Sequence, residues 1–257
     1  MPLLEIRNLG KRFGGLAAVS ELDLTIGRGE IFGLIGPNGA GKTTVLNMLG
    51  GTLFPSRGKI IFKGEDITRF PPHRRTQRGI ARVFQGNVLF SSFMVLENVV
   101  AGFHLHFKMG LAEIFSKMAS NSSKERALQK EAMEILQFVR LAEQADDMAV
   151  NLPHGKQRAL CLGIALATQA QLLLLDEPLT GLSGEETEAM MSMIRTLRDE
   201  RGITIVVVEH NIKAVTRLCD RIAVLDYGKK IAEGLPNKVV ENPTVIEAYL
   251  GVGENAV

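Results

Sequence analysis

Residues 31–44 constrain the fold of this chain more than any other stretch, and they read Ile-Phe-Gly-Leu-Ile-Gly-Pro-Asn-Gly-Ala-Gly-Lys-Thr-Thr. The stretch opens with a short apolar run over 31–35, which is typical of a buried parallel strand. The pattern Gly-x-x-x-x-Gly-Lys-Thr follows over 36–43, and apolar residues at helical spacing then continue to Gly50-Gly51, which can end a helix. Phosphate-binding loops in general lie between a strand and a helix, as this pattern does. The stretch therefore predicts an α/β fold that binds a nucleotide.

The residues of this loop have complementary roles in holding phosphates. Gly36, Gly39 and Gly41 allow the backbone to turn so that its N–H groups point toward an anion. A helix that starts near Lys42 adds the positive end of its dipole. The Lys42 ammonium can reach the β- and γ-phosphates, and the Thr43 hydroxyl can bind Mg²⁺. The other interpretation, a glycine-rich turn with a surface lysine, leaves the flanking strand and helix unexplained.

Composition and charge limit the possible classes of protein. The chain has 257 residues, enough for one large domain or for a core with a smaller lobe. Its net charge of +2 implies no strong attraction to nucleic acid or to anionic lipid. It contains no apolar run near the roughly 18 residues of a membrane-spanning helix, and its start has no signal-peptide layout. Cys161 and Cys219 lie far apart and form no metal spacing, so we expect reduced thiols and a cytoplasmic protein.

The N-terminal region predicts β structure over residues 3–30. Apolar and polar residues alternate over 22–26, which is the pattern of a half-buried strand. Residues 59–67 predict another pair of strands around a turn, and the polar, basic segment 69–79 predicts a linker. Phe13, next to two glycines, is either an exposed aromatic residue that stacks on a base or a core residue. The residues alone favour the core.

Residues 96–150 predict a helical region, because apolar residues recur at helical spacing among many lysines and glutamates. Within this region, His104 and His106 are two positions apart, so on a helix they diverge and form a poor metal pair. The clearest apolar face carries Leu128, Ala132, Ile135 and Val139.

Polar side chains follow two predicted core strands. Residues 171–178 read Gln-Leu-Leu-Leu-Leu-Asp-Glu-Pro, which places Asp176 and Glu177 at the carboxyl end of a buried strand, where ligands bind in α/β sheets. Asp176 can hold the Mg²⁺ of a bound nucleotide, and Glu177 can polarise an attacking water. Gln85 ends a strand predicted over 80–85 and is either a contact to metal or water or a solvated loop residue.

The last third of the chain alternates predicted helices and strands. Ser183 opens a capping box that starts a helix, and residues 203–208 predict one more buried strand. His210 follows this strand and can donate to a γ-phosphate. Residues 220–234 predict a hairpin, and residues 244–250 predict a last helix.

This set of motifs resembles the ATP-binding subunits of ABC transporters, and the resemblance covers essentially the whole chain. Residues 36–43 match the Walker A motif, and residues 172–176 match Walker B. The resemblance implies an α/β fold with a P-loop NTPase (RecA-like) core, an N-terminal antiparallel β-subdomain and a helical subdomain. It divides a single ABC ATPase domain, 1–257, into a nucleotide-binding core with the β-subdomain (1–96 and 156–257) and a helical subdomain that carries the signature loop (97–155).

The resemblance also assigns single residues to the binding and hydrolysis of ATP with Mg²⁺. Gln85 matches the Q-loop, Glu177 the catalytic glutamate and His210 the switch histidine. Phe13 falls where family members stack an aromatic ring on adenine, which favours its exposed alternative. The implied Mg²⁺ ligands are Thr43, Gln85 and Asp176, and the implied nucleotide-binding residues are Phe13, Val19, Gly36, Pro37, Asn38, Gly39, Ala40, Gly41, Lys42, Thr43 and Thr44.

Three stretches, 12–19, 93–99 and 242–251, resemble the branch of this family that imports branched-chain and other hydrophobic amino acids. The implied function is ATP hydrolysis that energises such import. Amide or urea import, lipid export and a non-transport ABC ATPase are the alternatives, and the last class usually carries a long coiled-coil insertion or a second cassette. A GTPase is disfavoured, because Val240 stands where guanine recognition requires an aspartate.

The family signature Leu-Ser-Gly-Gly-Gln is altered in this chain. In the family this segment reaches across a dimer to the γ-phosphate on the other subunit, and a proline in place of the serine has neither hydroxyl nor backbone N–H. The histidine and the lysine of the segment can donate instead. Ser183 also replaces the usual D-loop aspartate, although both residue types cap helices. The segment consists of Leu152, Pro153, His154, Gly155 and Lys156.

The altered signature bears on the partners of the chain. A pair of identical subunits would lack the signature serine at both γ-phosphates. We therefore expect a second, non-identical ABC ATPase subunit. The resemblance further implies two transmembrane permease subunits and, indirectly, a substrate-binding protein, with this chain peripheral on the inner face of the cell membrane. No nucleic-acid partner is expected.

Overall fold

The computed structural model describes residues 1–103 and 123–250. The strands are β1 (Leu4–Phe13), β2 (Leu16–Ile26), β3 (Ile31–Ile35), β4 (Arg57–Phe62), β5 (Glu65–Asp66), β6 (Ile80–Val83), β7 (Leu172–Asp176), β8 (Thr204–Val208), β9 (Arg221–Asp226) and β10 (Lys229–Gly234). The helices are α1 (Lys42–Gly50), α2 (Pro72–Gln77), α3 (Val95–Gly102), α6 (Ser123–Phe138), α7 (His154–Ala167), α8 (Gly184–Arg201), α9 (Ile212–Leu218), α10 (Pro236–Val240) and α11 (Pro243–Leu250), with 3-10 turns η1 (Ala142–Gln144) and η2 (Ala149–Asn151).

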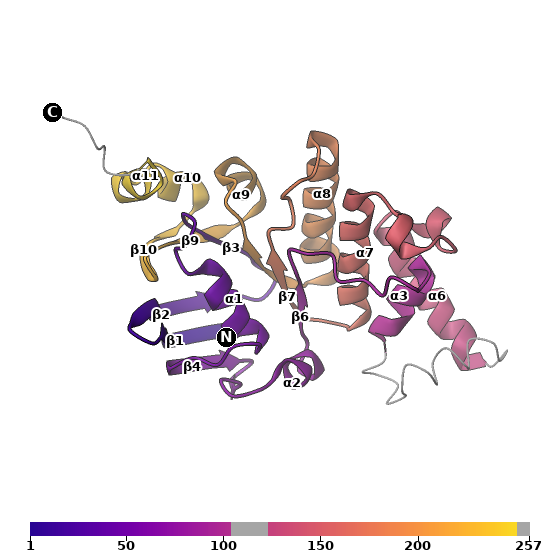
Figure 1. The fold of residues 1–257 in the computed structure, drawn as a ribbon, viewed down its shortest axis with the longest axis horizontal. Coiled ribbons are helices and arrows are strands. Elements are labelled where there is room, and N and C mark those ends of the chain that lie inside the picture. The colour runs from indigo at the N-terminus through magenta and orange to yellow at the C-terminus, as the bar shows by residue number, and fades with distance from the viewer. Residues whose placement is uncertain (104–122, 251–257) are drawn as a thin grey trace.

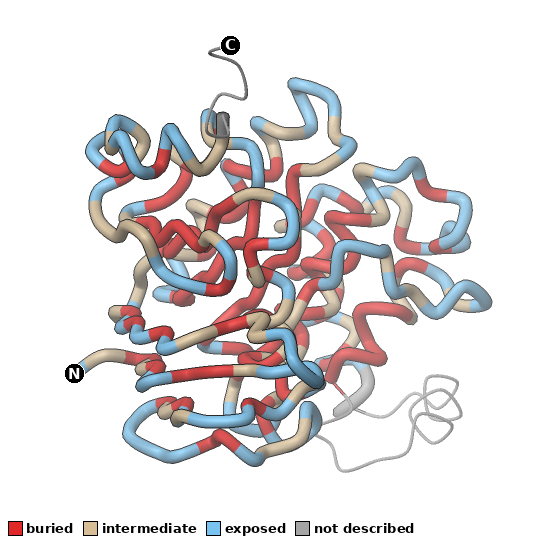
Figure 2. The backbone as a smooth tube through the Cα atoms, turned by 60° about the vertical axis from the view of Figure 1, so that its left-hand side comes forward, coloured by how far each residue is buried: buried red, intermediate tan, exposed pale blue. Residues whose placement is uncertain are grey.

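A six-stranded sheet in the order β10-β9-β3-β8-β7-β6 forms the centre of the molecule (Figure 1). β3 pairs in parallel with β8 and β9, and β7 pairs in parallel with β6 and β8, so their carboxyl ends lie at one edge. Every residue of β3, β7 and β8 is buried, because helices cover both faces of the sheet. Figure 2 shows the buried residues gathered in the interior, with exposed loops around them. At this edge β3 leads into the phosphate loop, β6 leads to Gln85, β7 to Glu177 and β8 to His210.

A second sheet, in the order β2-β1-β4-β5, is antiparallel, as predicted. Along β2, Leu22, Leu24 and Ile26 are buried while the residues between them are exposed. These side chains share one hydrophobic cluster with Val45 and Leu46 of α1 and with residues of β3 and β8. Helix α1, which follows the phosphate loop, is therefore held in place between the two sheets.

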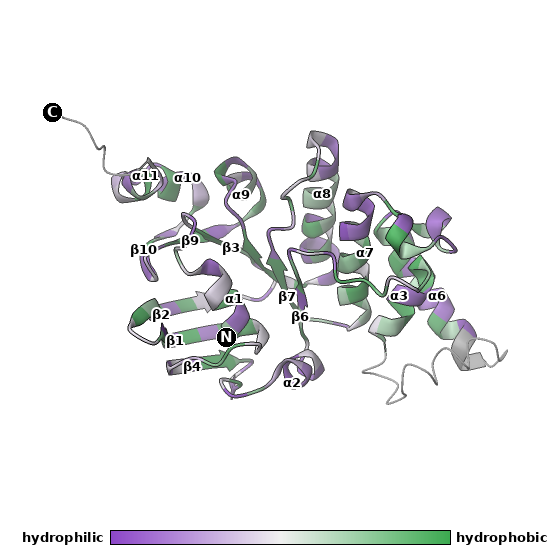
Figure 3. Ribbon diagram, in the orientation of Figure 1, coloured by the Kyte–Doolittle hydropathy of each residue, from purple (hydrophilic) through white to green (hydrophobic). Residues whose placement is uncertain are grey.

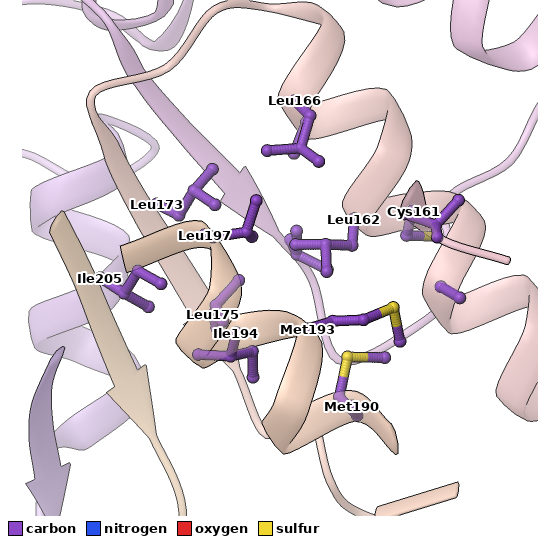
Figure 4. Packing of buried hydrophobic residues seen from close by; sticks show 14 of the residues in the cluster. Cys161, Leu162, Leu166, Leu173, Leu175, Met190, Met193, Ile194, Leu197 and Ile205 are labelled. Carbon is purple, nitrogen blue, oxygen red and sulfur yellow. The ribbon is translucent and has the colours of Figure 1, made fainter. Parts of the chain in front are cut away.

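The opposite face of the central sheet is covered by helices α7 and α8, with α3 and α6 packed beyond α7. Figure 3 shows that α3 is largely hydrophobic, whereas α6 is polar except on its packed face. The predicted apolar face of this region is buried, and so are the methionines of α8, which pack in the core. Figure 4 shows Leu162 and Leu166 of α7 and Met190, Met193, Ile194 and Leu197 of α8 around Leu173, Leu175 and Ile205 of the sheet.

The segment 69–79 is not the linker that its composition predicted, because it contains α2. Pro72 starts the helix, and Arg75 on it is 1% exposed. The Arg75 guanidinium donates 2.6 and 2.7 Å hydrogen bonds to the carbonyl oxygens of Met48 and Leu49, at the end of α1. A buried cation thus anchors a helix whose residues look solvated in the sequence.

One further boundary differs from the prediction. The strand predicted over 80–85 ends at Val83, so Gln85 lies in the loop beyond β6. The predicted subdomain boundary between residues 155 and 156 falls in the first turn of α7, which packs against α3, α6 and β6. The division into subdomains therefore stays a prediction. Residues 104–122 of the predicted helical subdomain, including His104 and His106, lie outside the described residues.

Candidate nucleotide-binding and catalytic site

The loop between β3 and α1 requires glycine at its first and last positions. Gly36 and Gly41 have φ angles of +150° and +101°. A Cβ at Gly36 would collide with the carbonyl oxygen of Leu225, and one at Gly41 with that of Ala18. Helix α1 begins at Lys42 and has no acidic residue in its first turn. The positive end of the helix dipole therefore acts on whatever the loop encloses.

Lys42 lies across this loop and is only 6% exposed. Its Nζ donates 2.8 Å hydrogen bonds to the carbonyl oxygens of Gly36 and Pro37. Burial lowers the pKa of Lys42, whereas the charges of Glu177 and Asp176 act in the opposite direction. The two carboxylates at the end of β7 thus favour the charged form of Lys42, which is the form that binds phosphate.

A pocket of about 330 Å³ opens beside Lys42. The start of β2 forms one wall, the phosphate loop forms another, and Glu177 closes one side. It contains most of the residues predicted to bind a nucleotide, and their contact with one stays a prediction. The lining residues are Leu16, Ala17, Ala18, Asn38, Gly39, Ala40, Gly41, Lys42, Thr43, Thr44, Glu177 and Tyr227.

Phe13 and Val19, which are predicted to bind the nucleotide, are not among the residues that line the pocket, whereas Tyr227, which was not predicted to bind it, is. Phe13 is 50% exposed and is paired in register with Leu16, which lines the pocket, so the core interpretation of Phe13 is wrong. Its stacking on adenine stays a prediction. Val19 is 1% exposed and lies behind Gly41, away from the pocket lining. Tyr227, which the sequence indicated only as part of a turn, is 87% exposed and lines the pocket.

Two side chains predicted to be catalytic, those of Gln85 and His210, converge on the third, that of Glu177. The Gln85 Nε2 donates a 2.7 Å hydrogen bond to Oε2 of Glu177. His210 Nδ1 lies 3.7 Å from Oε1 of the same carboxylate, and Thr180 Oγ1 lies 3.3 Å from Oε2. Glu177 has a φ of +48°, a value uncommon for a residue other than glycine. The predicted trio is therefore assembled at the carboxyl edge of the sheet.

Two buried charged residues support this arrangement and were missed in the sequence. Arg158 on α7 is 4% exposed and donates to the carbonyl oxygens of Glu177, at 2.6 Å, and Gln85, at 3.3 Å. Glu209 is 1% exposed, accepts a 2.8 Å hydrogen bond from the Leu179 N–H, and has its pKa raised by burial. Arg158 stands in an apolar helix and Glu209 after an apolar strand, so neither position signals its distant partner.

A third missed residue, Arg82, holds the other carboxylate. Its Nη2 donates a 2.8 Å hydrogen bond to Oδ2 of Asp176, and its Nη1 donates a 2.6 Å hydrogen bond to Oδ1 of Asn47 on α1. Both side chains of the Arg82–Asp176 pair are 8% exposed. Asp176 thus keeps one carboxylate oxygen that Arg82 does not engage.

The residues predicted to bind Mg²⁺ fit that ion. Thr43, Asp176 and Gln85 offer hydroxyl, carboxylate and amide oxygens, which are the hard ligands that Mg²⁺ prefers. The Gln85 amide nitrogen is engaged with Glu177, which leaves its oxygen available. Within residues 1–103 and 123–250, no group of three His, Cys, Asp or Glu side chains could hold a metal alone. An ion here would need nucleotide phosphates as further ligands.

Comparison with known proteins decides the family. Residues 19–180 match the ABC transporter family, and residues 229–255 match the family described as branched-chain amino acid ATP-binding cassette transporter. The chain belongs to the ABC transporter family. The family assignment made from its sequence motifs is confirmed, and so is the predicted P-loop NTPase fold.

The relatives match over nearly their full length. The branched-chain amino acid transport ATP-binding protein BraF of Pseudomonas aeruginosa is 38% identical, with 97% of this chain and 98% of BraF covered. The corresponding protein LivG of Escherichia coli is 40% identical, with the same coverage. Among solved structures, a nucleotide-free ATP-binding cassette of an ABC transporter has a TM-score of 0.85 at 29% identity, covering 99% of this chain and 100% of that one. The ADP conformation of the cassette MJ1267 has a TM-score of 0.85 at 30% identity, covering 98% and 99%.

The altered ABC signature forms the start of α7. Leu152 is buried, whereas Pro153, His154 and Lys156 are exposed, and Pro153 is the N-cap of the helix without a side-chain capping bond. Gly155 approaches the Glu186 carboxylate so closely that a Cβ would collide with it. None of the five signature residues lines the pocket beside Lys42. Their contact with a second subunit stays a prediction.

The D-loop position of Ser183 forms the predicted capping box. The Ser183 hydroxyl accepts a 3.3 Å hydrogen bond from the Glu186 N–H, and the Glu186 carboxylate accepts a 2.9 Å hydrogen bond from the Ser183 N–H. Serine therefore caps α8 as an aspartate would, and the prediction of this cap is confirmed.

Proposed function

We propose that this chain is the ATP-hydrolysing subunit of a transporter that imports branched-chain or other hydrophobic amino acids. The observation that carries hydrolysis is the meeting of Gln85 and His210 on Glu177, next to the pocket that contains Lys42. The cargo is supported by relatives named for branched-chain amino acid transport and by the match of residues 229–255 to the same branch.

The site residues suggest a division of roles in ATP binding. The N–H groups of the loop and the Lys42 ammonium bind the phosphates, and Phe13 stacks on adenine. Thr43, Asp176 and Gln85 hold Mg²⁺, which neutralises charge on the phosphates when it is bound. Lys42 and Thr43 line the pocket, Gln85 contacts the Glu177 carboxylate beside it, and Phe13 is paired in register with Leu16 of the pocket wall.

Hydrolysis follows from the groups around Glu177. Its carboxylate accepts a proton from the attacking water, which acquires nucleophilic character as the O–H bond breaks. Gln85 fixes the orientation of this carboxylate through its 2.7 Å hydrogen bond. His210, whose side chain is half exposed, donates to the γ-phosphate as negative charge develops on it.

The proposed partners are a second, non-identical ATPase subunit, two transmembrane permease subunits and, indirectly, a substrate-binding protein. No helix among the described residues combines the length and hydrophobicity of a bilayer crossing. We propose that the permeases hold the chain on the inner face of the cell membrane. We infer no nucleic-acid partner, since the net charge is only +2.

An apolar groove of about 290 Å³ between the loop after β6, α3 and α7 is the proposed contact for the permeases. Exposed aromatic and aliphatic side chains border it, and the Q-loop residue Gln85 follows it directly. We call it the Q-loop groove. Its main lining residues are Val83, Phe84, Val88, Phe90, Cys161 and Ile164.

Reconstitution tests this proposal. The chain is co-expressed with the permeases and the ATPase encoded beside it, and the purified complex is placed in proteoliposomes that contain ATP. We expect ATP-dependent uptake of labelled leucine or isoleucine, and no uptake with a non-hydrolysable analogue. Uptake of labelled urea or an amide instead would assign the transporter to the alternative branch, which imports amides or urea. ATPase activity that DNA stimulates and permeases do not would overturn the transporter assignment.

A further inference from the structure

A buried arginine lies between the Q-loop groove and the carboxylate assigned to Mg²⁺. We propose that Arg82 is a positioning residue that orients Asp176 for the metal and transmits changes in the groove to it. This inference rests on the proposed function, because it assumes that Asp176 binds the Mg²⁺ of a nucleotide.

The first part of the argument is the geometry on the nucleotide side. The two ends of the Arg82 guanidinium donate to different elements, with Nη2 on Asp176 at 2.8 Å and Nη1 on Asn47 at 2.6 Å. Asn47 belongs to α1, the helix that begins at Lys42. Arg82 therefore ties the carboxylate to the helix of the phosphate loop. Because Arg82 engages only Oδ2 of Asp176, Oδ1 is the oxygen left for a metal.

The second part is the contact on the groove side. The Arg82 guanidinium carbon lies 4.6 Å from the centre of the Phe84 ring. Phe84 is 41% exposed and lines the groove together with Arg82 itself. The Arg82 Nε is buried without a hydrogen-bond partner within the described chain, so the ring and the two acceptors hold the guanidinium. A side chain that seats against Phe84 would move the ring and, through it, the guanidinium.

A lysine cannot reproduce this arrangement. A guanidinium is a rigid planar fork with donors at both ends, whereas an ammonium is a point charge on a flexible stem. Arg82→Lys would keep a positive charge near Asp176 and lose one of the two hydrogen bonds. This substitution therefore separates the orienting role of Arg82 from its charge.

Metal binding is measured directly by electron paramagnetic resonance, with Mn²⁺ as the probe. Each variant is the purified full chain with ATP, and each also carries Glu177→Gln. We expect Arg82→Lys to weaken Mn²⁺ binding by about tenfold, the loss typical of one hydrogen bond to a charged group. ATP binding without metal should change by less than about twofold, because Arg82 does not line the nucleotide pocket. The matched control is Arg78→Lys, since Arg78 is an exposed arginine paired with Glu65 at 2.8 Å. A folded Arg82→Lys protein with unchanged Mn²⁺ affinity would overturn the proposal.

The link to the groove is tested with a double-mutant cycle. Phe84→Ala should weaken Mn²⁺ binding about threefold when Arg82 is present and leave it nearly unchanged in Arg82→Lys, because the two residues act through one contact. Phe54→Ala is the matched control, since Phe54 is 40% exposed and its ring lies 5.9 Å from the guanidinium of Arg69. Equal effects of Phe84→Ala in both backgrounds would refute the transmission. If the chain with Arg82 intact bound no Mn²⁺ with ATP, the proposed function itself would fail, which is a different outcome.

Discussion

The side-chain amide of Gln85 donates a 2.7 Å hydrogen bond to Oε2 of Glu177, although the two residues lie 92 positions apart in the sequence. The bond joins the loop that borders the Q-loop groove to the proposed base. Arg158 reinforces the junction, because its guanidinium binds the backbone carbonyls of both residues. Movement of this loop therefore changes the environment of the base directly.

Glu177→Gln is expected to retain ATP binding and to lose hydrolysis. The amide preserves the shape of the side chain but cannot accept a proton at neutral pH. The ATP-bound dimer should then accumulate, which size-exclusion chromatography with ATP would detect. Glu185→Gln is the control, since Glu185 is an exposed carboxylate in the first turn of α8. Turnover at the normal rate in Glu177→Gln would show that another residue is the base.

Lys42→Ala is expected to weaken ATP binding and abolish hydrolysis, because the β- and γ-phosphates lose their buried cation. Equilibrium titration with a fluorescent ATP analogue measures the affinity, and phosphate release measures turnover. Lys238→Ala serves as the control, because Lys238 is exposed on α10. Unchanged affinity and turnover in Lys42→Ala would remove this lysine from the site.

Phe13→Ala is expected to raise the KM for ATP with a smaller effect on kcat, since stacking on the base stabilises the ground state and the transition state alike. The expected loss in binding is about 1–3 kcal/mol, as for aromatic stacking on bases elsewhere. Tyr227→Ala gives the comparison, because Tyr227 is the exposed aromatic residue that lines the pocket. A larger KM change for Tyr227→Ala than for Phe13→Ala would assign the stacking to Tyr227.

Arg75→Met is expected to destabilise the fold by about 3 kcal/mol, because it leaves buried carbonyl acceptors without their donor. These acceptors are the carbonyl oxygens of Met48, Leu49 and Phe70, at 2.6 to 2.9 Å. Urea unfolding measures the change in free energy. Arg74→Met, at the exposed neighbouring position, should cost less than about 0.5 kcal/mol. Equal losses for both substitutions would refute the anchoring role of Arg75.

The local parts of the site could be predicted from the sequence, because each depends on neighbouring residues. The phosphate loop needs its glycines, its lysine and the flanking strand and helix within one stretch. Asp176 and Glu177 come directly after a run of leucines that predicts a buried strand. The capping box at Ser183 and the hairpin at Tyr227 are equally local. Such features leave a pattern that a single stretch of sequence displays.

The parts that could not be predicted depend on contacts between distant segments. Arg82 and Asp176 lie 94 positions apart, and Arg158 and Gln85 lie 73 apart. Each arginine stands beside apolar residues, where its charge gives no indication of the acceptor that compensates it. Phe13 shows the reverse case, because its residue type favours burial while the turn after β1 leaves the ring half exposed. Only the tertiary structure determines the partners of these arginines and the exposure of this phenylalanine.

The altered signature predicts that the two sites of the assembled ATPase pair are unequal. Pro153 caps α7 without a hydroxyl or an N–H, and His154 and Lys156 are the exposed donors beside it. Since each signature serves the opposite subunit, the impaired site is the one on the partner. The Lys42–Glu177 site of this chain would face the signature of the partner, and it is therefore expected to be the better hydrolytic site.

Single-site substitution in the assembled transporter measures this inequality. The base glutamate is changed to Gln in one ATPase subunit at a time, and ATP hydrolysis is compared at saturating ATP. Glu177→Gln in this chain should remove most of the activity, because it disables the site that pairs with an intact signature. The same change in the partner should leave most of it. A reversed ranking would contradict the prediction, and so would a fully active transporter that contains two copies of this chain and no other ATPase.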